Sequence, residues 1–381
     1  MIKVAFIGFP AVGGNYTHFC YLKEGLTNVE MNLIGLGEHS GDLLPDNRFI
    51  HLGKTLYKKS NAKELAKLFI DFITNEHYDL VIPMNSPIVV SVIPFLPSTC
   101  KVVQIVNSDT PRVYKYVTSY LDSIHHIVCI SKKQEAEIKT RTGIDFFMHH
   151  VSLIPHGVHT EQDEIKVNVP EKLQLGYIGR MHQGHKNIFL LPEILKKLTC
   201  PYSFEFIGEG PDKEALVQRL TTAGINYHSL GEIKRNEIHS YVKKWDIQLF
   251  PSTVEGFGLT LIECMNSGVV PLSNELKGIT DYIITHQNDG FIIKQNDLNE
   301  YVRLIELLNN DRVLLTSMKE QAQETVKERF NLELILLQYQ QLFQEVYETP
   351  KVKEALHFSE WKPYVEYKPS LLKRIVTRIF K

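Results

Sequence analysis

Three observations in the sequence predict an α/β protein built from two domains. Short apolar segments rich in Val and Ile alternate with segments of helical pattern, and this series stops at a polar stretch, residues 160–171, and then starts again. Strands that are apolar throughout and alternate with helices form parallel sheets covered on both faces. The length of 381 residues suits two domains, at ~100–200 residues per domain. We therefore expect two Rossmann-like domains, residues 1–165 and 166–349, that face each other across a cleft.

The first domain begins with a predicted strand at residues 2–8. Its apolar stretch runs only from Val4 to Gly8, and a Gly/Pro loop follows. This pattern is typical of a buried first strand and not of a signal peptide. Further strands are predicted at 29–36, 78–83, 101–106, 126–130 and 151–154, with helices that include 61–75 and 132–142.

The second domain repeats the alternation of strands and helices. Strands are predicted at 173–178, 203–207, 226–230, 246–250 and 269–272, and helices between them at 187–198, 212–223, 235–244 and 258–267. Three more helices, at 298–309, 311–327 and 331–347, complete this half. We expect residues 350–381 to return to the first domain.

The composition is that of a folded soluble protein. With 43% hydrophobic and 23% charged residues, it excludes disordered, collagen-like and disulfide-scaffold classes. Five widely spaced cysteines without a C-x-x-C predict reduced thiols and a cytoplasmic protein. No apolar run approaches the ~18 residues needed to span a bilayer.

The net charge of −2 disfavours nucleic acid as a partner, but it is unevenly distributed. Residues 350–381 carry a net charge of +5, so the rest of the chain carries −7. In the last segment, Leu371–Lys381, apolar and basic residues fall on opposite helical faces. Such a helix either lies in an anionic membrane interface on the inner face of the plasma membrane or docks on the first domain.

The most informative segment runs from Pro251 to Glu263 and joins a predicted strand to a helix. Glycines at such a turn let the backbone approach a ligand, and the free amides of the first helical turn face an anion. Glu255 precedes the helix, where its carboxylate can accept hydrogen bonds from hydroxyls. Glu263 lies about two turns further along and can reach another part of the same ligand. A sugar joined to a nucleoside diphosphate presents such a series of groups.

A second loop, Tyr177–Asn187, follows the first strand of the second domain. It carries Arg180 and Lys186, a planar fork of donors and a point charge that together suit a diphosphate. They could stabilise charge that develops on a leaving phosphate.

Two further glycine loops give weaker signals. Ile207–Pro211 lies between a strand and a helix, as many ordinary turns do. The loop Gly8–Gly14 after the first strand does not fit G-x-G-x-x-G, which disfavours NAD binding.

Together these motifs resemble a known family. Glu255 and Glu263 form an E-x7-E motif, and Gly179-Arg180, Lys186-Asn187, Gly208–Pro211 and Ile154–Val158 precede it in the family's order. The set is similar to the retaining glycosyltransferases of family 4, which have the GT-B fold. The resemblance covers about residues 1–347.

The resemblance implies a nucleotide-sugar donor held mainly by the second domain and an acceptor held mainly by the first. It implies Arg180 and Lys186 on the diphosphate, Glu255 on the donor sugar and Glu263 on the ribose, with retention of anomeric configuration and no metal. The implied donor-binding set is Gly13, Gly14, Gly179, Gly208, Glu209, Gly210, Pro211, Ile233, Gly256, Phe257, Gly258, Leu259, Thr260 and Glu263.

One position departs from the family pattern. The family often has a His-Ser-Asp sequence after the fourth strand, where this chain has Asn107, Ser108 and Asp109. Asn can donate a hydrogen bond to a hydroxyl or phosphate, but it cannot carry a proton or a positive charge. We keep Asn107 with Glu255, Arg180 and Lys186 as the predicted catalytic set, and Asp109 on the acceptor side.

The leading hypothesis is a retaining transferase that moves a hexose or N-acetylhexosamine from a nucleotide-diphosphate sugar to a glycan or lipid-linked acceptor. The pathway, surface polysaccharide or glycoconjugate synthesis, rests on family analogy. Two alternatives remain open, a nucleotide-sugar epimerase of the same fold and a weakly active or non-catalytic accessory homologue. Asn107 alone motivates the second alternative.

Overall fold

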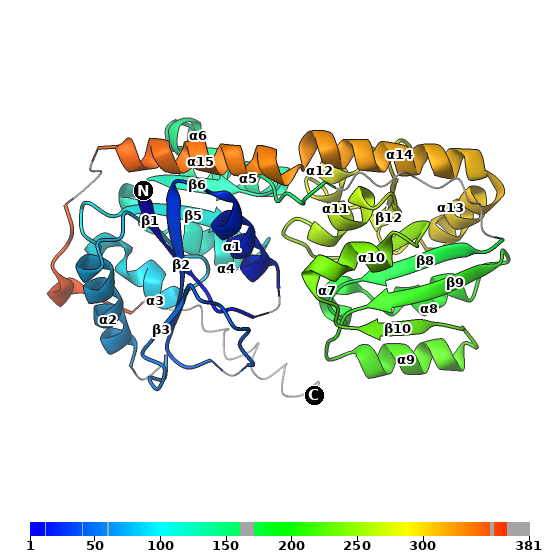
Figure 1. The fold of residues 1–381 in the computed structure, drawn as a ribbon, viewed down its shortest axis with the longest axis horizontal. Helices are drawn as coiled ribbons and strands as arrows, with labels where there is room; N and C mark the ends of the chain where they lie inside the picture. The colour runs from blue at the N-terminus through cyan, green and yellow to red at the C-terminus, as the bar shows by residue number, and fades with distance from the viewer. Residues whose placement is uncertain (12, 40, 59–60, 161–170, 351–353, 364–381) are drawn as a thin grey trace.

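Two parallel β-sheets, one in each half of the chain, form the fold (Figure 1). The computed structural model describes residues 1–381 apart from 12, 40, 59–60, 161–170, 351–353 and 364–381. The prediction of two Rossmann-like α/β domains is confirmed. The exact domain limits, 1–165 and 166–349, stay a prediction.

The first sheet has seven strands in the order β3-β2-β1-β4-β5-β6-β7, all paired in parallel. They are β1 (Ile2–Ile7), β2 (Val29–Leu36), β3 (Phe49–Leu52), β4 (Leu80–Ile82), β5 (Lys101–Val106), β6 (His126–Cys129) and β7 (Val151–Leu153). The connecting helices are α1 (Gly14–Gly25), α2 (Ala62–Asn75), α3 (Pro87–Val92), α4 (Pro111–Val117), α5 (Lys132–Thr142) and α6 (Ile144–His150), with short 3-10 turns η1 (Ile93–Phe95) and η2 (Leu121–Ser123).

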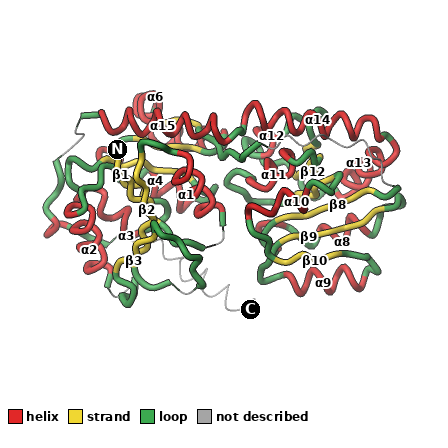
Figure 2. Tube along the Cα trace, viewed as in Figure 1, coloured by secondary structure: helices red, strands yellow, loops and turns green. Residues whose placement is uncertain are grey.

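Both faces of this sheet are buried. Successive side chains of a strand point to opposite faces, and those of β1 enter two different apolar clusters: Val4 and Phe6 one, Ala5 and Ile7 the other. The continuous apolar strands of the sequence are therefore explained by helices on both sides (Figure 2).

The second sheet has six strands in the order β10-β9-β8-β11-β12-β13. They are β8 (Leu173–Ile178), β9 (Tyr202–Ile207), β10 (His228–Gly231), β11 (Ile247–Phe250), β12 (Val270–Asn274) and β13 (Phe291–Ile293). The helices that follow β7 along the chain are α7 (Gln183–Lys186), α8 (Leu190–Leu195), α9 (Lys213–Thr222), α10 (Ile238–Val242), α11 (Leu259–Asn266), α12 (Thr280–Ile283), α13 (Leu298–Asn310), α14 (Arg312–Arg329) and α15 (Leu332–Glu348), with 3-10 turns η3 (Arg235–Glu237) and η4 (Phe358–Glu360). Of these, α15 and η4 pack on the first domain.

Two predicted helices of this half differ in the structure. The helix expected at 187–198 is shorter, because only α8 (Leu190–Leu195) forms within that range, and Asn187, the C-cap of the preceding α7, has the left-handed φ of 49°. The helix expected at 235–244 starts with the 3-10 turn η3. The short strands β3 and β13 were not predicted.

One apolar cluster joins the two domains. It contains Phe6 of β1, Leu261 of α11, Val326 of α14 and Tyr339 of α15. Figure 1 shows α14 and α15 nearly end to end, α14 along the second domain and α15 along the first. The chain thus crosses back to the first sheet at Phe330, between these helices.

After α15 the described chain stays on the first domain. The amide of Leu356 donates to the carbonyl of Pro94 (2.9 Å), and the buried Trp361 donates from Nε1 to Ser91 Oγ (3.0 Å). The predicted basic helix, Leu371–Lys381, lies outside the described residues. Within the described ranges no helix is long and apolar enough to cross a membrane.

The replacement Trp361→Phe is expected to lower the free energy of unfolding by about 1–2 kcal/mol, because it keeps an apolar ring but removes the hydrogen bond to Ser91. Urea unfolding followed by far-UV circular dichroism measures the change. Adding Ser91→Ala to Trp361→Phe should cost less than the sum of the two single changes, since both remove the same bond. Full additivity would show that the bond does not anchor this segment.

Candidate active site

The loops that the sequence singled out in the second domain meet at one edge of its sheet. They follow β8, β9 and β11, which are neighbours in the order β9-β8-β11. Because the strands are parallel, their carboxyl ends lie at the same edge, where ligands bind in sheets of this type.

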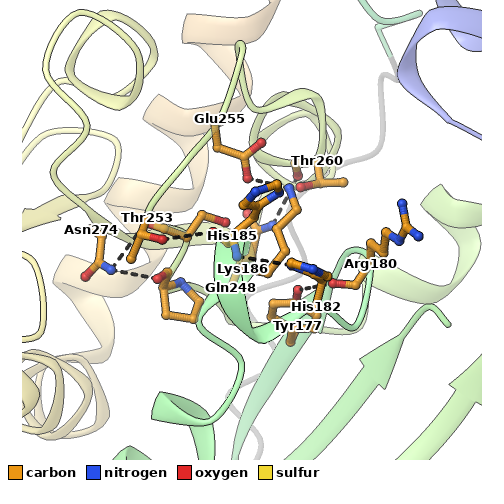
Figure 3. A network of polar contacts seen from close by, with 12 residues as sticks. Tyr177, Arg180, His182, His185, Lys186, Gln248, Thr253, Glu255, Thr260 and Asn274 are labelled. Carbon is orange, nitrogen blue, oxygen red and sulfur yellow. Dashed lines mark hydrogen bonds and ion pairs between the residues drawn. The ribbon is translucent and has the colours of Figure 1, made fainter. Parts of the chain in front are cut away.

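An ion pair between Lys186 and Glu255 lies at this edge (Figure 3). Lys186 ends α7 and Glu255 lies on the loop before α11, and Lys186 Nζ is 2.5 Å from Glu255 Oε1. Both side chains are mostly buried, with 23% and 11% of their surface exposed. From the sequence we expected these residues to contact different parts of one ligand, and the structure brings them into direct contact with each other.

Backbone contacts between the two loops bring this pair together. The carbonyl of His185 accepts hydrogen bonds from the amides of Thr253 (2.8 Å) and Val254 (3.3 Å). His182 caps α7, because its Nδ1 accepts from the amide of His185 (3.2 Å). The one-turn helix α7 is thereby attached to the loop that carries Glu255.

The helix α11 begins at this loop with an uncapped first turn. Its N-cap, Gly258, has φ 110° and makes no side-chain capping bond. The preceding residue, Phe257, is buried and packs its ring edge-on against His156 and Phe330. The backbone of Phe257, and not its side chain, is therefore the part available to a ligand.

Polar residues beneath the loop hold it in place and were missed in the sequence. The fully buried Asn274 at the end of β12 donates from Nδ2 to the carbonyls of Pro251 (2.7 Å) and Ser252 (3.3 Å). Tyr301 of α13 in turn donates to Asn274 Oδ1 (3.2 Å). Gln248 of β11 donates to the carbonyl of Thr260 (3.2 Å). Amide side chains inside apolar strands were the signal that could have identified them.

The glycine loop after β9 packs against the loop after β8. A Cβ on Gly208 would lie 2.1 Å from the carbonyl oxygen of Gly179, and one on Gly210 would lie 2.4 Å from that of Met181. Both glycines also have positive φ, 130° and 156°. Contact between the two loops therefore already requires these glycines, whether or not a ligand approaches them. Glu209 pairs with Lys213 (2.5 Å).

Arg180 does not join the ion pair. Its side chain is exposed, and Figure 3 shows its guanidinium pointing away from Lys186 and Glu255.

In the first domain, Gly13 precedes α1 and Gly14 begins it, and a Cβ on either glycine would meet no atom within 4 Å. The backbone at Gly13 and Gly14 is thus unobstructed within the described part of the chain.

Asn107 lies at the junction of the two domains. A Cβ on Gly256 would be 2.9 Å from the carbonyl oxygen of Asn107, so the two loops are in contact. The Asn107 side chain accepts a hydrogen bond from Nδ2 of Asn85 (2.6 Å), which follows β4 and was not predicted from the sequence. Asp109 accepts from Tyr114 (2.7 Å) and pairs with Lys133 (2.5 Å), an arrangement that fixes the loop.

Glu263 is a half-buried carboxylate on α11. Burial raises its pKa to about 7, and the nearby positive charge of Arg235 opposes that shift. Arg235 itself contacts the first domain: its guanidinium lies 3.5 Å from the ring centre of Tyr21 and donates to the carbonyl of Thr17 (3.3 Å). Arg235 was not predicted, because one arginine on a polar turn carries no pattern.

The raised pKa of Glu263 predicts a pH dependence of stability. The folded protein holds this proton up to about pH 7, whereas the reference pKa is 4.5. The unfolded chain therefore releases the proton at a lower pH than the folded protein does. As a result, the free energy of unfolding should fall by about 1–3 kcal/mol as the pH rises from about 4.5 to 7. Glu263→Gln should remove this decrease, and Glu237→Gln, an exposed glutamate of η3, should leave it unchanged. Urea unfolding at several pH values tests this, and an unaltered slope in Glu263→Gln would contradict it.

Comparisons with known proteins find relatives for much of the chain. Residues 159–325 match the family model described as glycosyl transferases group 1. TuaC of Bacillus subtilis, a glycosyltransferase named for teichuronic acid biosynthesis, is 23% identical over 54% of this chain and 52% of its own. A poly(ribitol-phosphate) alpha-N-acetylglucosaminyltransferase of Staphylococcus aureus is 23% identical over 60% of this chain and 46% of its own. This chain thus spans about half the length of these two curated relatives.

A solved structure matches over nearly the whole chain. HepE of Anabaena, in complex with UDP and glucose, superposes with a TM-score of 0.71 at 15% identity, covering 91% of this chain and 100% of HepE. The prediction of the GT-B fold is thereby confirmed.

Proposed function

We propose that this protein is a retaining glycosyltransferase of family 4 that moves a hexose or N-acetylhexosamine from a nucleotide-diphosphate sugar to a glycan or lipid-linked acceptor. The observation that carries the proposal is the Lys186–Glu255 ion pair directly before the uncapped first turn of α11. A cation, a carboxylate and free amides within one loop pair suit a sugar diphosphate.

Each group has a role in the proposed reaction. Lys186 and the amides of Gly256–Gly258 neutralise the charge that develops on the leaving diphosphate. Glu255 accepts hydrogen bonds from hydroxyls of the transferred sugar, and Glu263 from the ribose. Arg180, exposed beside the site, adds a second cation when the donor is bound. In this proposal no metal takes part, so transfer should persist in excess EDTA.

The proposed pathway is the synthesis of a cell-surface polysaccharide. Support comes from two relatives whose names place them in teichuronic acid and poly(ribitol-phosphate) modification, and from the similarity to HepE, which was solved with UDP and glucose. Peripheral membrane contact through Leu371–Lys381 is part of the proposal, and liposome flotation with and without residues 368–381 tests it.

Release of nucleoside diphosphate from a panel of nucleotide sugars, with the purified full chain, tests the function. Hydrolysis of one sugar class is expected, and the proton spectrum of the freshly released sugar should show the donor's own anomer. Conversion of the donor to an epimer, without nucleotide release, would favour the epimerase. Neither binding nor hydrolysis of any donor would overturn the proposed enzyme and favour an accessory protein.

A further inference from the structure

A cluster of aromatic and basic side chains lies in the first domain, away from the Lys186–Glu255 pair. It consists of Phe9, His39, His51 and Lys58. We propose that it is an acceptor subsite that binds a phosphate or carboxylate group carried by a sugar. The proposal rests on the proposed function, and it adds an anionic glycan as the class of acceptor.

The cluster lies where the first three strands of the sheet meet. Phe9 follows the carboxyl end of β1, His39 follows that of β2, and His51 belongs to β3, the strand paired with β2. Ligands of parallel sheets bind at this edge. Phe9 begins the segment of chain that leads to Gly13 and Gly14, the predicted donor contacts.

Gly35, which has no side chain, leaves the space that the aromatic rings of this cluster occupy. A Cβ on Gly35 would lie 2.6 Å from the Phe9 ring and 2.9 Å from the Phe49 ring. The Phe9 ring stacks on the His39 imidazole, with their centres 4.4 Å apart, and meets the His51 ring edge-on at 5.3 Å. Phe9 is thus a fixed platform that holds two imidazoles close together.

The Phe9 ring also lies close to a cation, the ammonium group of Lys58. Lys58 Nζ lies 4.8 Å from the centre of the Phe9 ring, and among the described residues no carboxylate forms an ion pair with it. Burial lowers the pKa of Lys58, and the negative charge of Glu38 opposes that effect. Lys58 is nevertheless exposed, so an anion can approach its ammonium group and favour the charged form.

The imidazoles supply further donors. His51 Nε2 contacts the carbonyl of Gly37 at 2.8 Å, so it carries the proton there and Nδ1 is the second ring nitrogen. Burial, with the positive charges of Lys58 and His51, lowers the pKa of the exposed His39. Lys58 and His51 thus disfavour the charged form of His39, whereas Glu38 favours that of Lys58. A bound anion would favour the charged forms of His39 and Lys58, so the cluster suits an anionic ligand better than a neutral sugar.

Imidazole resonances of the full-length protein, assigned with His39→Gln and His51→Gln, test the proposal by titration. The probes are glucose 6-phosphate, glucuronate, inorganic phosphate and glucose. We expect saturable shifts of the His39 and His51 signals with the first two probes, weaker shifts with inorganic phosphate, and none with glucose. The relative affinities of the two anionic sugars distinguish a phosphate from a carboxylate group.

Lys58→Gln should weaken binding of the preferred anionic sugar about 10-fold, the loss of one charged contact. Lys54, which is exposed like Lys58 and lies on the same segment, provides the matched control, and Lys54→Gln should bind like the unmodified protein. Absence of saturable shifts, or equal binding by Lys58→Gln and the unmodified chain, would overturn the proposal. Because the titration contains no nucleotide sugar, its failure would leave the proposed donor chemistry standing.

Discussion

Replacing Glu255 by glutamine is expected to lower kcat/KM for nucleotide-sugar hydrolysis by about 10²–10³-fold, if the donor site lies where we propose. Glutamine keeps the shape of the side chain but removes the charge that pairs with Lys186 at 2.5 Å. It also turns one acceptor oxygen into a donor, so a sugar hydroxyl loses its partner. Steady-state release of nucleoside diphosphate measures the change.

The ion pair gives this prediction a second test. Lys186→Met should cause a loss of similar size, because it removes the cation from the leaving diphosphate. The double variant should lose less than the product of the two single effects, since the side chains act on each other. Lys196→Met is the control: Lys196 pairs with Glu193 on the exposed surface of the same domain, and such pairs contribute little. Unchanged rates in Glu255→Gln would show that the site has been assigned wrongly.

The position of this site was predictable from the sequence, but its internal contacts were not. Apolar periodicity locates β8, β9 and β11, and the rule for parallel sheets places the following loops at one edge. The contact between Lys186 and Glu255, however, depends on backbone hydrogen bonds from Thr253 and Val254 to His185. Backbone bonds between distant loops leave no residue pattern, because almost any side chain is compatible with them.

The glycine loops show a second limit of sequence reasoning. A glycine predicts a close approach or a positive φ without revealing which neighbour approaches. At Gly208 and Gly210 that neighbour is the backbone of Gly179 and Met181. The missed strands β3 and β13 are short, with four and three residues, and β3 is only half-buried, so it lacks the apolar run of the central strands.

Gly256 differs from these glycines, because its nearest neighbours belong to the other domain. A Cβ there would lie 2.9 Å from the carbonyl oxygen of Asn107 and 3.2 Å from Ser108 Cα, both backbone atoms. The carbonyl of Gly256 also accepts from Gln134 of α5 (3.2 Å). The two domains therefore meet at this residue with no space for a methyl group.

We accordingly expect Gly256→Ala to separate activity from folding. The added methyl group would push the loops of the two domains apart at this contact. A displacement of about 1 Å between reacting groups lowers the rate about 10²-fold. Each sheet is untouched by the change, so far-UV circular dichroism should remain that of the unmodified protein. X-ray scattering should show a larger radius of gyration, which a purely local effect on the loop would not produce. Full activity in Gly256→Ala would mean that the junction at Asn107 opens during turnover, and that the contact between the two loops is not needed for the reaction.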